Sequence, residues 1–95
     1  MTIPAIACSG TYYSFESGSR TADGNRFNPY KISIALRNTH YGDYYKVCYN
    51  GRCIRALHND WGPAAWTGNC IDLSLGAKNS LHFPGKGNVT YGKIK

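Results

Sequence analysis

The chain contains few side chains that could perform acid–base chemistry, and two of these are placed where a ligand could reach them. It has five acidic residues, of which Asp60 and Asp72 each stand beside an apolar, strand-like run. Trp61, Gly62 and Pro63 follow Asp60 directly, so its strand must end and turn there. A carboxylate at such a junction faces a surface groove more often than the core, so Asp60 and Asp72 are candidates for acid–base chemistry. The alternative is an Asp in a turn and an Asp near a helix N-terminus.

Aromatic and imidazole side chains lie close to Asp60 in the sequence. Trp61 and Trp66 follow it, and His58 precedes it. Indole rings beside a carboxyl group raise its pKa by excluding water, as a proton donor near neutral pH requires. We expect both Trp residues to shield Asp60 and to contact a substrate. His58 joins them if the strand register turns its ring to a groove rather than to the core.

The composition favours a small β-rich domain with a basic surface. The chain has 95 residues, 14% aromatic side chains and a formal net charge of +6, so we treat residues 1–95 as a single domain and expect a monomer. A basic surface attracts polyanions or simply aids solubility. Because Lys and Arg form no cluster, a nucleic-acid partner is not expected. No run approaches the roughly 20 apolar residues of a membrane-spanning helix.

Four cysteines in so short a chain indicate two disulfides and an oxidising compartment. Residues 48–53 are typical of a hairpin whose two-residue turn is Asn50-Gly51, of type I′. Cys48 and Cys53 then form a non-hydrogen-bonded cross-strand pair, where side chains come closest. This geometry permits a disulfide across the hairpin.

Cys8 and Cys70 pair by elimination, and their bridge would add on the order of 4 kcal/mol by closing a long loop. A zinc site built from the cysteines and His58 is the alternative, but their spacing matches no strong ligand pattern. We expect no metal or cofactor. Residues 1–7 lack the charged start of a signal peptide. We therefore expect a secreted, periplasmic or virion-associated protein whose signal was removed or which leaves its cell by another route.

Short alternating runs indicate several strands and one helix. Ile32, Ile34 and Leu36 share one face, as in a half-buried strand, and Ser74 is a suitable N-cap for a helix that ends at Leu81. The expected strands are 10–15, 31–36, 44–49, 52–57, 71–73 and 89–94, with loops or turns at 17–20, 21–29, 38–43, 59–69 and 85–87. Six or seven short strands in one small chain predict a closed barrel, because closure removes exposed sheet edges.

Five motifs follow one another along the chain: Tyr12-Tyr13, Thr21-Ala22-Asp23-Gly24-Asn25-Arg26-Phe27-Asn28-Pro29, Tyr41-Gly42, Asn59-Asp60-Trp61-Gly62-Pro63 and Ile71-Asp72-Leu73-Ser74. In this order they resemble the rare-lipoprotein-A-like double-psi β-barrel domain, of the expansin- and barwin-like superfamily. The resemblance covers residues 10–81. It implies a mainly β, closed six-stranded double-psi barrel with one short helix, acting on cell-wall polysaccharide.

The resemblance also implies roles for individual residues. Asp60 takes the place of the family's catalytic Asp, and Asp72 that of a carboxylate in the groove of expansins and related endoglucanases. Tyr12 or Tyr13 takes the place of a substrate-contacting aromatic residue in the first strand. Enzymes of this type carry a His where this chain has Leu36, so the sequence departs from the family at that position.

Peptidoglycan is the substrate that the resemblance favours, and a lytic transglycosylase is the expected activity. Its sugar 6-hydroxyl closes the product ring, so Asp60 alone could act as acid and then as base, with Asp72 assisting. An inverting hydrolase would need the two carboxylates roughly 6.5–9.5 Å apart. The alternatives are a non-catalytic, expansin-like module that binds or loosens wall polysaccharide, which Leu36 favours, and a barwin-like defence protein or protease inhibitor.

Overall fold

A computed structural model describes residues 5–13, 21–26 and 28–94, and within them it shows six strands, one α-helix and one short 3₁₀ helix. In chain order these elements are β1 (Ile6–Tyr13), β2 (Ser33–Leu36), β3 (Tyr44–Tyr49), β4 (Arg52–Trp61), η2 (Ala65–Thr67), β5 (Ile71–Ser74), α1 (Leu75–Leu81) and β6 (Lys86–Lys93). Neither helix in this part of the chain is long and apolar enough to cross a membrane.

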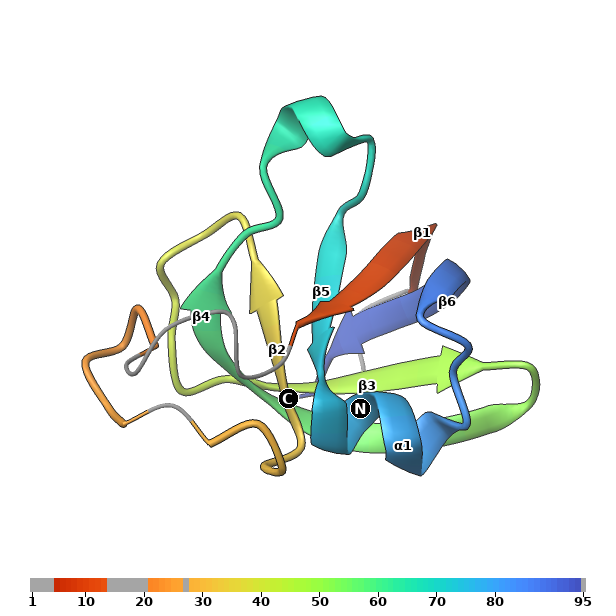
Figure 1. Ribbon diagram of the computed structural model, residues 1–95, viewed down its shortest axis with the longest axis horizontal. Helices are drawn as coiled ribbons and strands as arrows, with labels where there is room; N and C mark the ends of the chain where they lie inside the picture. Colours follow the sequence, from red (N-terminus) through yellow and green to blue (C-terminus); the bar gives the residue numbers. More distant parts are fainter. Residues whose placement is uncertain (1–4, 14–20, 27, 95) are drawn as a thin grey trace.

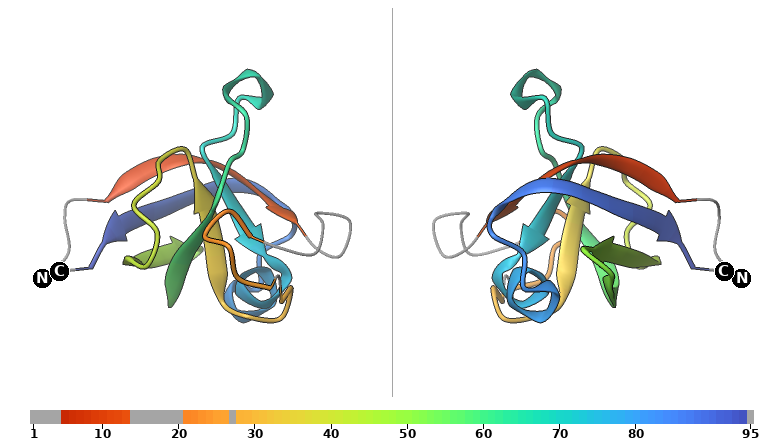
Figure 2. Two further views of the ribbon diagram at one scale, coloured as in Figure 1. Left: turned by 90° about the vertical axis from the view of Figure 1, so that its left-hand side faces the viewer. Right: turned by 90° about the vertical axis from the view of Figure 1, so that its right-hand side faces the viewer.

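The strands close into a barrel in the order β1-β5-β2-β4-β3-β6, drawn in Figure 1 and from two further sides in Figure 2. β1 pairs in parallel with β5, and β2 with β4, while the other neighbouring strands are antiparallel. α1 lies across the lower end of the barrel in the view of Figure 1. The predicted small closed barrel with one short helix is confirmed.

Apolar side chains fill the interior of the barrel. Every second residue of a strand points to the same face, and the inward rows include Ile34, Val47 and Leu73, all fully buried. Ala77 and Leu81 of α1 are buried against them. The helix therefore covers one end of the core. The outer face of β2, β4 and β5, which does not contribute to the core, can carry functional side chains.

Ser74 begins the helix, as predicted. Its Oγ accepts a hydrogen bond from the N–H of Ala77 at 3.1 Å, which makes it the N-cap. The same hydroxyl donates to the carbonyl of Lys31 at 2.6 Å and accepts from the N–H of Ser33 at 3.1 Å. One buried hydroxyl thus joins the helix start to the beginning of β2.

Both predicted disulfides are present, Cys48–Cys53 and Cys8–Cys70. Both residues of the Asn50-Gly51 turn have positive φ, 50° and 81°, as a type I′ turn requires. Cys48 stands opposite Cys53 in the β3–β4 ladder. No cysteine remains free to act as a zinc ligand.

Three strands, β1, β4 and β6, extend by three or more residues beyond one end of their predicted ranges. β1 begins at Ile6 and β6 at Lys86, in segments expected to be a lead-in and a turn, because these two strands pair with each other. β4 continues to Trp61, because β2 pairs with its last residues. These pairings join segments that are far apart in the sequence, so local residue patterns do not predict how far each strand extends. The expected end of the first strand at Phe15 and the loop at 17–20 lie outside the described residues.

Removing the two disulfides should have unequal effects on stability. Replacing both Cys8 and Cys70 by Ser should lower the free energy of unfolding by about 4 kcal/mol, and replacing both Cys48 and Cys53 by about 2 kcal/mol. The bridged residues are 62 and 5 positions apart, and the longer loop restricts the unfolded chain more. Denaturant unfolding of both double variants measures the difference; equal losses would contradict the expectation.

Candidate active site

A bulge in β4 decides where the side chain of Asp60 points. The pairing of β2 with β4 shifts by one residue at Asn59, and beyond it Ala35 stands opposite Asp60. Ile34 and Leu36 belong to the core cluster, whereas Ala35 does not. If the register did not shift, Asn59 would stand opposite Ala35, and Asp60 would stand opposite Leu36 and point into the barrel. The bulge therefore turns Asp60 to the outer face.

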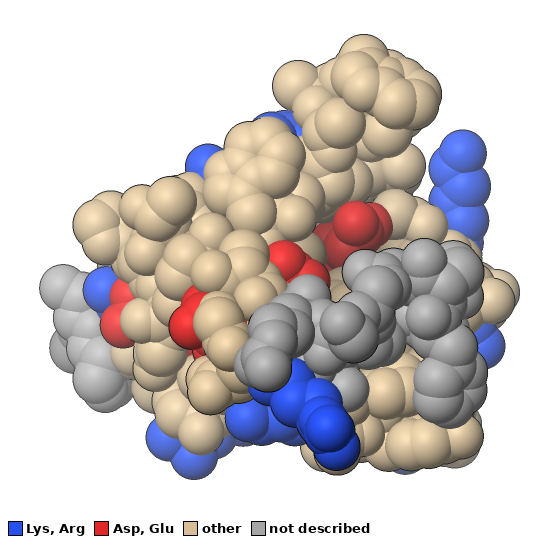
Figure 3. Space-filling model, turned by 60° about the vertical axis from the view of Figure 1, so that its left-hand side comes forward, with Lys and Arg blue, Asp and Glu red and all other residues tan. Residues whose placement is uncertain are grey.

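Asp72 reaches the same face from the other side of β2. Ala35 is paired with Asp72 of β5 as well as with Asp60 of β4. Residues directly opposite one another place their side chains on one face, so the two carboxylates flank a single small side chain. Two strand spacings separate their backbones by roughly 10 Å. Figure 3 shows acidic side chains at the centre of one face, below a projecting lobe, with Lys and Arg near its edges.

Two backbone amides hold Asp60 in place. Its Oδ1 accepts hydrogen bonds from the N–H groups of Ala22 and Trp61, each at 2.9 Å. The N–H of Asp23 donates to the carbonyl of the bulged Asn59 at 3.2 Å. The loop at residues 21–26 is therefore tied to the bulge at two points. Two amide donors on one oxygen suit an ionised carboxylate.

Asp72 lies in a poorly solvated position. Burial raises its pKa from the usual 3.8 to about 6, and the negative charge of Asp60 adds to the rise. Its Oδ1 is buried and has no hydrogen-bond partner in the described part of the chain. Gly62 leaves room at the other oxygen, since a Cβ there would lie 3.7 Å from Oδ2. Asp72 is therefore a carboxyl group that can hold a proton close to neutral pH.

Tyr13 brings a phenol to the same region. Its side chain is buried, and burial raises its pKa to about 12. A hydrogen bond with Ser33 acts in the opposite direction, and the negative charges of Asp60 and Asp72 raise the pKa further. The Tyr13 hydroxyl thus stays protonated and can donate a hydrogen bond.

Three other aromatic residues predicted to contact a substrate are exposed. Tyr12 is 41% exposed and lies beneath the ammonium of Lys78, 5.1 Å from its ring centroid. Trp61 and Trp66 are 51% and 88% exposed. The two indoles were expected to desolvate Asp60, but the carboxyl group whose pKa burial raises is Asp72. Their contact with a substrate stays a prediction.

His58 lies inside the barrel, which corrects the prediction that it contacts a substrate. It is fully buried, with the rings of Tyr41 and Tyr45 at 5.1 Å and 6.0 Å between centroids. Its Nδ1 is 3.2 Å from the carbonyl oxygen of His40, and its Nε2 is 3.0 Å from that of Asp60. The strand register turns this ring inward, where it supports the backbone of Asp60 from within.

A cavity of about 320 Å³ lies apart from the two carboxylates, and neither Asp60 nor Asp72 lines it. Its wall includes Leu36, Arg37, Tyr45, Cys70 and Tyr91. Leu36 also belongs to the core cluster. The side chain at position 36 therefore faces the core and this cavity, whereas the carboxylates lie on the outer face.

Three residues that shape this region are absent from the sequence-based list. Ala22 supplies an N–H to Asp60, and Gly62 leaves space beside Asp72. Arg37 bonds to the loop between β4 and β5. Gly62 carried a turn signal and Ala22 belongs to the second motif, but neither was assigned a role, and nothing local marks Arg37. Among the described residues, no group of three His, Cys, Asp or Glu side chains could hold a metal ion.

Two curated proteins are similar to this chain in sequence, and no family model matches it. The "probable endolytic peptidoglycan transglycosylase RlpA" of Synechocystis sp. is 41% identical over 76 residues, which are 76% of this chain and 23% of that protein. The protein of the same name from Nostoc sp. is 40% identical over 73 residues, 75% of this chain and 19% of that protein. The chain thus spans about a fifth of the length of these relatives.

Two solved structures share the fold. The Streptomyces papain inhibitor has a TM-score of 0.80 at 22% identity, with 97% of this chain and 96% of that chain covered. Cerato-platanin 3 from M. perniciosa has a TM-score of 0.58 at 13% identity, with 95% of each chain covered. The two curated relatives confirm the predicted resemblance to rare-lipoprotein-A-like proteins, and the two solved structures confirm the fold.

Replacing Asp60 by Asn should lower the pKa of Asp72, because it removes a negative charge that raises it. A ¹³C NMR titration of the Asp72 carboxyl carbon should have its midpoint at about 6 in the parent and at a lower pH in the variant, still above 3.8 because burial, the larger cause, remains. Asp43→Asn is the matched control, since Asp43 pairs with Lys93 at 3.1 Å. If the pKa of Asp72 is the same in the parent and in Asp60→Asn, the two carboxyl groups do not share one face of the barrel.

Replacing Asp72 by Asn should stabilise the protein at pH 7 but not at pH 3. The pKa of Asp72 is higher in the folded protein, about 6, than its ordinary value of 3.8. Its ionisation therefore costs stability as the pH rises from about 4 through about 6. Asn cannot ionise, so thermal melts followed by circular dichroism should show a Tm several degrees above the parent only at the higher pH. A lower Tm than the parent at pH 7 would contradict this.

Proposed function

We propose that this chain, a rare-lipoprotein-A-like double-psi β-barrel domain, acts on bacterial cell-wall peptidoglycan and cleaves its glycan strands as a lytic transglycosylase. The observation that carries the proposal is the pair of carboxyl groups on one face, with Asp72 poorly solvated beside Asp60. Two carboxyl groups in different environments can take opposite roles in proton transfer. The names of the two sequence relatives support peptidoglycan as the substrate.

The contacts favour Asp72 as the proton donor. Its raised pKa keeps a proton available for the glycosidic oxygen as the bond from C1 breaks. Asp60, held by two amides, would stabilise the positive charge at C1 and then accept the proton of the sugar 6-hydroxyl as the new C1–O6 bond forms. The sequence-based assignment of Asp60 as the sole acid and base stays a prediction.

Aromatic residues around the carboxylates would hold the glycan. Trp61 follows Asp60 directly and is half exposed, so its ring could stack on a sugar. The hydroxyl of Tyr13 is buried, so we place it behind the carboxylates and not in contact with the sugar. Tyr12 lies over α1 rather than beside this pair, so we place it outside the catalytic region.

A non-catalytic module that binds or loosens wall polysaccharide is the second candidate, and Leu36 favours it because the family's enzymes carry a His at this position. Cerato-platanin shares the fold with this chain. A defence protein or protease inhibitor is a third candidate, and the Streptomyces papain inhibitor also shares the fold. Pelleting with peptidoglycan without release of fragments would support the second candidate over the first.

The two disulfides indicate an oxidising compartment. We propose a secreted or periplasmic location, where the protein would meet peptidoglycan as a monomer. Association with a virus particle stays a prediction.

Digestion of purified peptidoglycan tests the proposed reaction. Mass spectrometry should detect muropeptides with anhydro ends, and Asp72→Asn and Asp60→Asn should each reduce their release by about 100-fold or more. Asp43→Asn is the control for the loss of one carboxylate and should retain activity. Full activity in both site variants would exclude the proposed acid–base pair, and release of reducing ends alone would indicate a hydrolase.

The rate of glycan cleavage should depend on pH in the way expected when Asp72 must be protonated to react. If Asp72 donates the proton, kcat/KM should fall as the pH rises through about 6, since the donor is then ionised. Initial rates of muropeptide release in buffers of constant ionic strength measure this profile. A rate that rises through the same range would contradict Asp72 as the donor.

A further inference from the structure

The loop at residues 62–70, which joins β4 to β5, stands out from the barrel with little packing of its own. It is the projecting segment at the top of Figure 1. It contains no charged side chain, no residue of η2 at its tip is buried, and Trp66 is 88% exposed. A loop with so few buried apolar contacts moves freely unless bonds at its base hold it.

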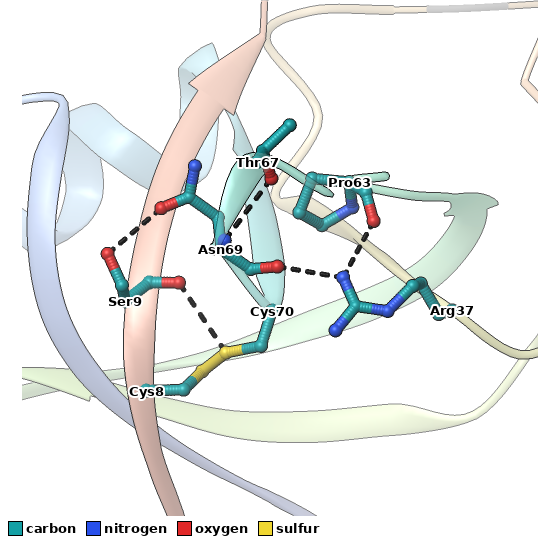
Figure 4. Close-up of a disulfide and its surroundings, with 7 residues drawn as sticks. All are labelled: Cys8, Ser9, Arg37, Pro63, Thr67, Asn69 and Cys70. Atoms are coloured by element: carbon teal, nitrogen blue, oxygen red, sulfur yellow. Dashed lines mark hydrogen bonds between the residues drawn. A yellow bond between two sulfur atoms is a disulfide. The ribbon is translucent and has the colours of Figure 1, made fainter. Parts of the chain in front are cut away.

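One side chain bonds to both ends of this loop. Nη1 of Arg37 donates to the carbonyl oxygen of Pro63 at 2.8 Å and to that of Asn69 at 2.7 Å, as Figure 4 shows. Arg37 reaches both because it follows β2, and β2 lies between β4 and β5 in the barrel. Hydrogen bonds from a charged donor are stronger than those between neutral groups.

The two ends of the loop are held by different numbers of other contacts. The Cys8–Cys70 disulfide fastens the end that enters β5, with Ser9 bonded to the side chain of Asn69 beside it (Figure 4). The end that leaves β4 is joined to β2 by a backbone hydrogen bond from Gly62, 3.3 Å long. A cavity of about 320 Å³ opens beside the guanidinium. Gly62 and Pro63 at the first end are buried, so packing also holds this end. Arg37 adds the side-chain bonds that join the first end directly to the second.

We propose that Arg37 is a positioning residue that holds the 62–70 loop rigid, so that Trp66 forms a sugar-stacking site beyond the two carboxylates. The ligand, a pyranose ring of the wall glycan, rests on the proposed function. The loop connects the end of β4 that carries Asp60 to the start of β5 that carries Asp72. The indole of Trp66 is therefore placed to contact a sugar further along the same glycan chain. A loop without charged side chains suits an uncharged sugar ring. An indole that is already held in place loses little conformational entropy when the sugar binds.

Backbone ¹⁵N relaxation tests the rigidity without any glycan. Order parameters of residues 64–68 should be near 0.85 in the parent and should fall below about 0.6 in Arg37→Met. Arg52→Met removes the same charge from the hairpin and should leave the loop rigid. If Arg37→Met does not fold, Arg37→Gln gives the same reading, because its amide is too short to span both carbonyls. Unchanged order parameters in a folded Arg37 variant would overturn the proposal.

Pelleting with insoluble peptidoglycan tests the consequence for binding. Trp66→Ala and Arg37→Met should each weaken binding about tenfold, and the double variant should bind no more weakly than Trp66→Ala, because both changes act through one indole. Arg37→Lys keeps the charge and N–H donors and should recover most of the affinity. Additive losses would overturn the link between Arg37 and Trp66.

The two experiments separate the two proposals. If the parent protein does not bind peptidoglycan, the proposed function fails. The relaxation measurement then still decides whether Arg37 holds the loop.

Discussion

The unpaired residue Asn59 in β4 is the feature on which the rest of the site depends. Side chains alternate along a strand, so a shift of one residue exchanges the inner and outer faces. Before the shift His58 points into the barrel, and after it Asp60 points outward beside Ala35. The carbonyl of Asn59 is bound by the N–H of Asp23, so the neighbouring loop stabilises the irregularity. A regular strand would have buried the charge of Asp60.

Two carboxylates on one face of the barrel repel each other, and their surroundings stabilise the two negative charges to different extents. Asp60 receives two backbone N–H donors, whereas the buried Oδ1 of Asp72 has none among the described residues. Burial and the charge of Asp60 therefore raise the pKa of Asp72 to about 6. One group is held by two amides and the other suits a transferable proton, so the two carboxyl groups can take different roles in acid–base catalysis.

Local patterns predicted the parts of the structure that local chemistry determines. The Asn50-Gly51 turn, the Cys48–Cys53 pair and the Ser74 cap each follow from a few adjacent residues. The bulge at Asn59 does not, because no Gly or Pro marks it and it appears only when β2 pairs with β4. The inward ring of His58, the extension of β4 and the bonds of Arg37 depend on the same long-range pairing. The sequence therefore placed both aspartates among the candidates, but not their different environments.

The most direct test is a crystal structure of the Asp72→Asn variant bound to a peptidoglycan glycan fragment. The account predicts a glycosidic oxygen within about 3 Å of the side chain at position 72. Asp60 should lie on the same side of β2, facing the sugar. A glycan bound elsewhere, or an Asp60 side chain turned into the barrel beside His58, would contradict the account.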